Sequence, residues 1–220
     1  MKKVIYIVLA VAAAVACLAG SIRIERFSER NARLAEQAFD PEELVDRFWH
    51  HDLDSLLAVA LDWRTFDSLL QADPKTLADR YGKNIGIGFP KSIFLTGSGV
   101  IGEVNKDFFT LQSPGRTYAV SCGRIFSNTV REASGVFDID AFENTMDFNL
   151  VSSQINGRID SLVIDPVRPR LKNGAVVIFA GAADVYPDRP AAEILRIVPL
   201  KLEVVVDAPL KISYIEPVGD

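Results

Sequence analysis

Histidine and cysteine are scarce in this sequence, and their scarcity limits the chemistry that the protein can perform. The 220 residues contain two histidines, His50 and His51, and two cysteines, Cys17 and Cys122. Neighbouring residues on a helix point about 100° apart, so the two histidines cannot bind one metal ion from a single helix face. The adjacent pair also disfavours a Ser-His or Cys-His arrangement, which disfavours a hydrolase. We therefore expect no enzymatic activity, no metal and no cofactor.

Positive charge is also in short supply. The chain has 24 Lys and Arg against 29 Asp and Glu, which gives a formal net charge of -5. A general nucleic-acid-binding protein needs a basic face to contact the phosphates. The charge balance therefore argues against a nucleic-acid partner.

The N-terminus is the longest apolar stretch of the chain. Lys2 and Lys3 precede an unbroken apolar run from Val4 to Ala19, which is the layout of a secretory signal. The run is slightly shorter than the roughly 20 residues that cross a bilayer comfortably, although somewhat shorter anchors are tolerated. We predict that residues 1–20 are a signal peptide or a membrane anchor that sends the rest of the chain to the periplasm.

Cys17 lies at the end of this run, behind Ala14-Val15-Ala16. Small residues before a cysteine resemble the lipobox of bacterial lipoproteins, although a leucine is usual where Ala14 stands. We predict that Cys17 is lipidated and anchors the protein to the bacterial membrane. Ordinary cleavage and an uncleaved anchor are the alternatives, and all three place the folded part outside the cytoplasm.

The next two segments are a tether and a group of helices. Residues 21–39 are polar and charged, and we interpret them as a tether, although their arginines favour the opposite orientation across the membrane. Asp40-Pro41-Glu42-Glu43 marks a helix start. Apolar residues then recur at helical spacing, and Asp73-Pro74 opens a last helix that stops at Gly82. Residues 40–82 are therefore predicted to form a helical subdomain.

The hydrophobic period changes from helical to alternating after Gly82. Strands are predicted at residues 92–104, 108–112, 116–122, 174–182 and 195–205, with a helix at 145–164. Three strands, a helix and two strands is the element order of an OB-fold barrel. For residues 83–220 we therefore predict an α+β fold, an OB-fold-like five-stranded β-barrel with a helix between strands 3 and 4; an open α+β sheet is the alternative.

Three details refine this barrel. The segment Gly97-Ser-Gly-Val-Ile-Gly102 matches a dinucleotide-binding motif, but strand residues surround it, so its glycines are interpreted as allowing the sharp coiling of a small barrel. Pro199 interrupts the last strand and predicts an edge or a bulge. The apolar stripe of the helix is predicted to comprise Phe148, Val151, Ile155, Ile159 and Leu162.

The segment from Asn128 to Asn149 carries the densest group of polar side chains. Asn and Asp at such positions cap helices and satisfy loop backbone groups, which is one interpretation. The other is a recognition site in which Arg131 meets an anionic or hydroxylated ligand. The candidate ligand-binding residues are Asn128, Arg131, Asn144, Asp147 and Asn149.

These residues also carry a family resemblance. The relevant stretches are Tyr81-Gly-Lys-Asn-Ile-Gly-Ile-Gly88, Asn128-Thr-Val-Arg-Glu-Ala-Ser-Gly135, Asn144-Thr-Met-Asp-Phe-Asn149 and Ser153-Gln-Ile-Asn156. Together with the basic-apolar start, they resemble the predicted periplasmic lipoproteins called domain of unknown function 2291. The resemblance implies an envelope lipoprotein, often encoded beside sugar ABC transporters, and brings no catalytic residues.

We therefore expect a non-enzymatic accessory or binding component linked to sugar ABC transport. Its expected partners are the membrane, through the N-terminal lipid or anchor, and a sugar ligand or a component of a sugar transporter. The alternative is a structural or assembly module of an envelope protein complex.

Lipidation at Cys17 can be tested directly. Cells that express the wild-type protein and are fed radiolabelled palmitate should yield a labelled band, and Cys17→Ala should abolish the label because the acylated sulfur is gone. Cys122→Ala is the matched control and should keep the label. A labelled Cys17→Ala protein would contradict the prediction.

Overall fold

The structure is a computed structural model of the chain that describes residues 39–84, 90–113, 116–188 and 194–205. The predictions for residues 1–38, including Cys17 and most of the tether, lie outside this part. Within the described residues, no helix is both long enough and apolar enough to span a bilayer. All the elements below belong to one unit that begins at Asp40.

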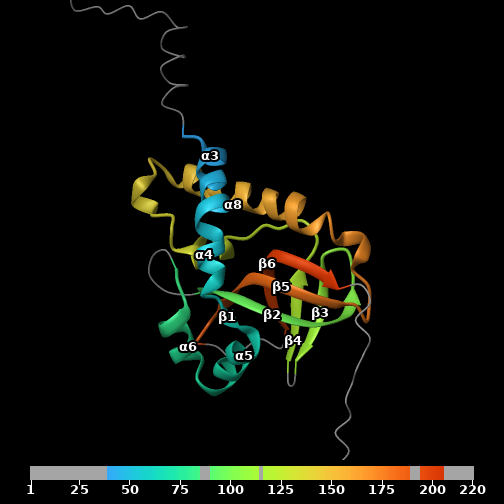
Figure 1. Cartoon of the computed structure of the whole chain (residues 1–220). Coiled ribbons are helices and arrows are strands. Elements are labelled where there is room, and N and C mark those ends of the chain that lie inside the picture. Colours follow the sequence, from blue (N-terminus) through green and yellow to red (C-terminus); the bar gives the residue numbers. More distant parts are fainter. Residues whose placement is uncertain (1–38, 85–89, 114–115, 189–193, 206–220) are drawn as a thin grey trace, which may run out of the picture. The chain divides into compact units, whose positions relative to one another are not determined.

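Five strands close into a barrel (Figure 1). They are β2 (Lys91–Val104), β3 (Phe108–Ser113), β4 (Arg116–Ser121), β5 (Val176–Val185) and β6 (Ile194–Val205). Around the barrel the order is β2-β3-β4-β6-β5, and β5 pairs again with β2. The β4–β6 pair is parallel and the other four are antiparallel. This topology, with a helix between β4 and β5, confirms the predicted OB-fold barrel.

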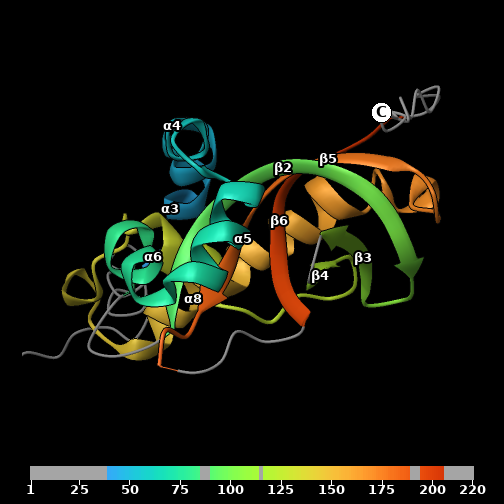
Figure 2. The ribbon, with the colours of Figure 1, turned by 90° about the horizontal axis from the view of Figure 1, so that it is seen from below.

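Strand β2 belongs to two sides of the barrel. Its residues Lys91 to Val100 pair with β5, and from Ile101 it pairs with β3, so the strand has to bend sharply (Figure 2). A Cβ atom at Gly97 would lie 2.3 Å from Cδ1 of Trp63, and one at Gly102 would lie 2.7 Å from Oγ1 of Thr110. These glycines therefore let neighbouring groups approach the strand. The Gly97–Gly102 motif lies within β2, as predicted, and forms no loop before a helix.

Pro199 marks a bulge, one of the two predicted outcomes. Gly181 pairs with Pro199 while the adjacent Ala180 pairs with Lys201, so Leu200 is an extra residue on β6. A proline cannot donate a ladder hydrogen bond, and a bulge is one of the places where a strand accommodates it.

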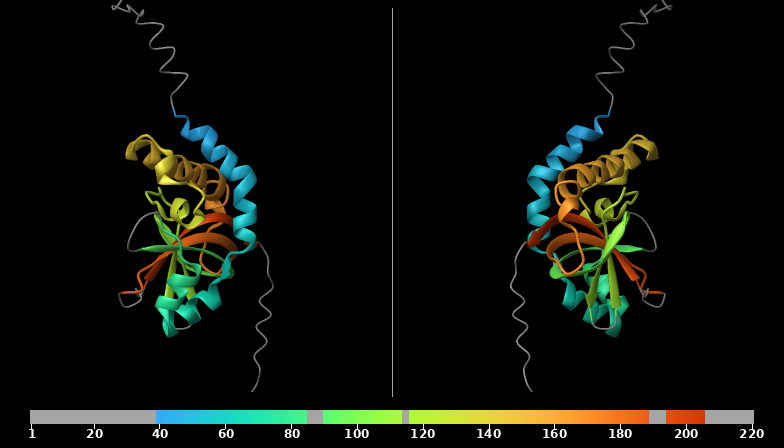
Figure 3. Two further views of the ribbon diagram at one scale, coloured as in Figure 1. Left: turned by 90° about the vertical axis from the view of Figure 1, so that its left-hand side faces the viewer. Right: turned by 90° about the vertical axis from the view of Figure 1, so that its right-hand side faces the viewer.

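The predicted long helix forms, but its last turns are wider than expected. Helix α8 (Thr145–Arg158) continues into the π-helical segment η3 (Ile159–Ile164), and the two lie across one end of the barrel (Figure 3). The prediction that Leu162 belongs to the apolar stripe is wrong, because Leu162 is 57% exposed, whereas Val163 and Ile164 are buried. A π-helical turn holds more residues than an α-helical turn, so the buried face moves along the sequence by one position.

Short helices precede the barrel strands, and aspartates cap three of them. The helices are α3 (Pro41–Arg47), η1 (Phe48–Asp52), α4 (Leu53–Ala58), α5 (Trp63–Ala72) and α6 (Pro74–Tyr81). The two-residue strand β1 (Leu61–Asp62) lies beside β2. The side chains of Asp40, Asp62 and Asp73 accept hydrogen bonds from the first backbone N–H groups of α3, α5 and α6. The predicted helix start at Asp40 and stop at Gly82 are confirmed.

Helix α5 lies on the side of the barrel away from α8 (Figures 2 and 3). Trp63 is buried and packs edge-on against Tyr118 of β4 and Phe179 of β5, with ring centroids 5.2 and 5.8 Å away. One turn later, buried Asp67 accepts hydrogen bonds from the Tyr118 hydroxyl at 2.7 Å and from Nε of Arg116 at 3.1 Å. Aromatic packing and a paired charge together fix α5 to the barrel.

The contact between Gly97 and Trp63 predicts a large effect from one methyl group. Gly97→Ala should lower the free energy of unfolding by about 2–3 kcal/mol, because the new Cβ displaces a ring that is packed on both sides. Urea denaturation followed by tryptophan fluorescence would measure this change.

Gly157→Ala is the matched control. A Cβ at this helical glycine would meet nothing within 4 Å. Alanine should therefore stabilise the protein, by about 0.5–1 kcal/mol, because it favours the helix. Equal effects of the two substitutions would contradict the packing argument.

Candidate functional site

A cavity of about 500 Å³ opens beside the barrel where three segments converge. Its walls come from the end of β4 with the loop that follows, from the end of β5, and from the start of β6. Two further hollows share Trp63, Arg64 and Ser98 in their linings. We take the first cavity as the candidate site because a half-buried carboxylate and several hydroxyl groups meet there.

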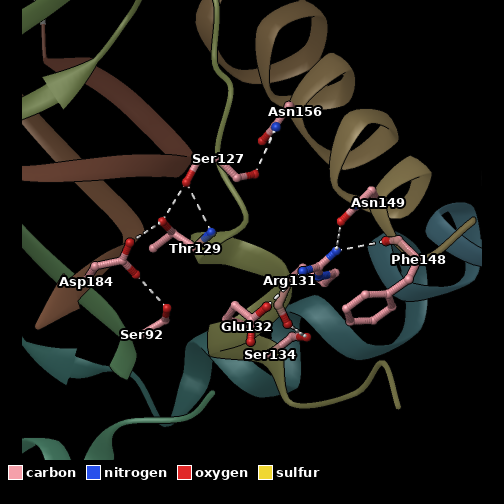
Figure 4. A network of polar contacts seen from close by, with 10 residues as sticks. All are labelled: Ser92, Ser127, Thr129, Arg131, Glu132, Ser134, Phe148, Asn149, Asn156 and Asp184. Carbon is pink, nitrogen blue, oxygen red and sulfur yellow. Dashed lines mark hydrogen bonds and ion pairs between the residues drawn. The ribbon is translucent and has the colours of Figure 1, made fainter. Parts of the chain in front are cut away.

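Asp184 of β5 is the carboxylate. Its Oδ1 atom accepts a hydrogen bond from the Ser92 hydroxyl at 2.6 Å, and its Oδ2 atom accepts one from the Thr129 hydroxyl at 2.9 Å (Figure 4). Ser92 is the direct cross-strand partner of Asp184 in the β2–β5 ladder, whereas Thr129 is the first residue of α7 (Thr129–Ser134). Strand pairing and the start of a helix therefore aim two hydroxyl groups at one carboxylate.

The surroundings of Asp184 act on its pKa in both directions. Burial raises the pKa above its ordinary value, and the charge of Glu132 adds to this increase. The hydrogen bonds from Ser92 and Thr129 stabilise the ionised form and so oppose it. The two hydroxyl groups thus compensate in part for placing a carboxylate where water is restricted.

Ser127 extends the network toward the rim of the cavity. Its hydroxyl lies 2.6 Å from the Thr129 hydroxyl and accepts a hydrogen bond from the backbone N–H of Thr129 at 3.1 Å. The backbone carbonyl of Ser127 accepts a hydrogen bond from the side-chain amide of Asn156 on α8 at 3.0 Å (Figure 4). Helix α8 therefore holds in place the loop that forms one wall of the cavity.

The rim of the cavity is apolar and aromatic. Phe126 is 85% exposed, and Tyr186 and Ile194 are exposed at the neighbouring strand ends. Arg124 also lines the cavity. Burial raises the pKa of Asp160 on η3, the charge of Asp165 adds to this increase, and the charge of Arg124 opposes it. Apolar and aromatic side chains with a few polar groups among them are the usual lining of a small-molecule site.

Among the residues predicted from the sequence, Arg131 joins two helices. It lies on α7, is 4% exposed, and has its guanidinium carbon 3.7 Å from the centre of the Phe148 ring. Nη1 donates to the Phe148 carbonyl at 2.9 Å and to Oδ1 of Asn149 at 3.3 Å, and Nη2 donates to Oε1 of Glu132 at 2.8 Å (Figure 4). These contacts fix α7 against the start of α8.

The other three predicted residues lie at helix starts. Oδ1 of Asn144 accepts the backbone N–H of Asp147 at 2.9 Å, and its amide donates to Oδ2 of Asp147 at 2.8 Å. Asn128 precedes α7, and its carbonyl accepts the backbone N–H of Glu132 at 2.9 Å. None of the five predicted ligand-binding residues is among the described residues that line the cavity.

Asp184, Ser92 and Phe126 were not predicted from the sequence as site residues. A single acid at the end of an otherwise apolar strand was the available signal for Asp184, because a strand end lies near connecting loops. The two histidines lie on η1, away from the lining of the cavity. In the described part of the chain, no three His, Cys, Asp or Glu side chains gather in a way that could hold a metal ion.

Comparison with known proteins gives a family and a fold. A family model described as "Predicted periplasmic lipoprotein (DUF2291)" matches residues 11–203. A crystal structure of an OB-fold protein from Thermotoga maritima matches with a TM-score of 0.69 at 21% identity, covering 76% of this chain and 99% of that chain. In all, 24 chains of solved structures match, whereas no curated protein does. At this level of identity, the structural likeness shows the fold alone.

The contacts of Arg131 predict a mainly structural role. Arg131→Met keeps the apolar stem but leaves the Phe148 carbonyl and Glu132 without this donor, so the free energy of unfolding should fall by about 2–4 kcal/mol. Arg80→Met, at an exposed arginine of α6, is the control and should change it by less than about 0.5 kcal/mol. Chemical denaturation would measure both; an Arg131→Met protein of normal stability would argue instead for the predicted ligand role.

Proposed function

The chain belongs to the DUF2291 family of predicted periplasmic lipoproteins, and we propose that it is a non-enzymatic component that binds a small carbohydrate for a sugar transporter. Membership of this family places the protein in the periplasm, anchored to the bacterial membrane. The family description names no ligand and no activity, so the proposal depends on the site itself.

The observation that carries the proposal is the cavity beside Asp184. Its volume of about 500 Å³ falls within the range of small-molecule sites, which is about 300–1,000 Å³. A sugar has hydroxyl groups for the polar floor and C–H groups that can pack on the exposed ring of Phe126. The genetic neighbourhood implied by the family resemblance, beside sugar ABC transporters, agrees with this ligand class.

The composition of the lining favours binding over catalysis. Most enzymes that cleave glycosidic bonds use a pair of carboxyl groups. Among the described residues that line the cavity, Asp184 is the one carboxylate, and neither histidine nor cysteine is present. The sugar would therefore leave the site unchanged.

A second candidate function is assembly of an envelope complex. Val100 of β2 and Ile178 of β5 are 49% and 47% exposed, and they lie near each other because Ser98 pairs with Ile178. Apolar side chains side by side on the outer face of a barrel favour contact with another protein. Cross-linking from position 100 in intact cells would capture such a partner.

Ligand binding can be tested with full-length protein in a zwitterionic detergent that has no sugar headgroup. Thermal unfolding would be measured with glucose, galactose, mannose, xylose, arabinose, ribose and myo-inositol. At 100 times its dissociation constant, a ligand stabilises a protein by about 2.7 kcal/mol, so at least one probe should raise the Tm by about 5–10 °C.

Ile194→Trp tests whether the shift in Tm comes from binding in the cavity. Ile194 is 55% exposed at the rim, so an indole there should obstruct the entrance without disturbing the core, and the shift should disappear. Val59→Trp, at an exposed position outside the lining of the cavity, is the control and should keep the shift. If no probe raises the Tm of the wild-type protein, the proposed function is wrong.

A further inference from the structure

The hydrogen-bonding groups on the floor of the cavity define which ligand atoms can meet them. We propose that the ligand is an uncharged polyol that donates two adjacent hydroxyl groups to the carboxylate of Asp184. This inference rests on the proposed function and specifies the chemistry of the same site. It follows from the direction of each hydrogen bond around Asp184.

The hydroxyl protons at the floor are already in use. Thr129 has one hydroxyl proton and donates it to Asp184, so the 2.6 Å contact between the Ser127 and Thr129 hydroxyls uses the proton of Ser127. Ser92 also donates its proton to Asp184. Around Asp184 the site therefore presents acceptors, and an incoming molecule has to supply the donors to this carboxylate.

The carboxylate has capacity for two more hydrogen bonds. Its two oxygens provide about four acceptor sites, and Ser92 and Thr129 occupy one on each oxygen. One free site on each oxygen is the arrangement that two neighbouring hydroxyl groups of a polyol can satisfy together. Hydrogen bonds to an ionised acceptor are also stronger than those between neutral groups.

Charge distinguishes the polyol from other donors. A cationic amine could also donate to Asp184, but Arg124 and Arg196 line the same cavity and oppose the entry of a cation. The two arginines would attract a carboxylate or phosphate, but such an anion would be repelled by the negative charge of Asp184 and has no proton to donate to it. An uncharged donor can approach Asp184 without repulsion from the arginines or from the carboxylate.

Three probe classes and one substitution test this inference. The uncharged probes are the seven polyols named above, the anionic probe is glucose 6-phosphate, and the cationic probe is putrescine. For every probe that raises the Tm, the dissociation constant would be measured by titration calorimetry on the wild-type protein, on Asp184→Asn and on Asp79→Asn. Asp79 is an exposed aspartate of α6 outside the lining of the cavity, which makes it the matched control.

We expect one or more polyols to bind and the charged probes to bind at least tenfold more weakly. Asp184→Asn replaces one acceptor oxygen with an NH₂ group, so polyol affinity should fall about tenfold or more, whereas Asp79→Asn should bind like the wild type. Monodeoxy analogues of the bound polyol provide a measurement that needs no variant. Removal of either of two adjacent hydroxyl groups should weaken binding to the wild type about tenfold.

The outcomes separate this inference from the proposed function. If no probe binds, both are wrong. If a polyol binds, Ile194→Trp excludes it and Asp184→Asn leaves its affinity unchanged, the cavity is a ligand site and the polyol–Asp184 contact is wrong. Tighter binding of glucose 6-phosphate or putrescine than of every polyol would also overturn the inference.

Discussion

The structure depends on the double pairing of β2, which hydrogen-bonds to β5 along its first part and to β3 at its end. A strand can serve both neighbours only if it bends, and the bend brings Trp63 and Thr110 to positions where a side chain at 97 or 102 would collide with them. Glycine at both positions removes the obstacle. The space beside Gly97 is then filled by the ring of Trp63, which also contacts Tyr118 and Phe179.

The same pairing creates the floor of the cavity. Ser92 and Asp184 are opposite each other in the β2–β5 ladder, so the register of the two strands sets the distance between their side chains. Thr129 adds the third group from the start of α7, and Arg131, two residues later, holds α7 against α8. The polar network in Figure 4 thus runs from a barrel strand to the helix that covers the barrel end.

Features determined by nearby residues could be predicted from the sequence. The caps at Asp40 and Asp73, the strands and an edge or bulge at Pro199 follow from local patterns, and the strand order follows from the succession of elements. Leu162 was placed on the wrong face because the hydrophobic period does not reveal where an α-helix widens into π-helical turns. The site was harder to predict than the fold, because Asp184 is 92 residues from Ser92 and 55 from Thr129 and no local pattern connects them.

The division between a fixed floor and an exposed rim has an evolutionary consequence. Phe126 and Ile194 contribute little to the hydrophobic core because most of their surface faces solvent, whereas Asp184 is held by two neighbours on different elements. Mutations at the rim therefore cost little folding energy, while mutations at the floor disturb strand and helix contacts together. Descendants of one ancestral gene could diversify their selectivity through such rim positions and inherit the scaffold unaltered.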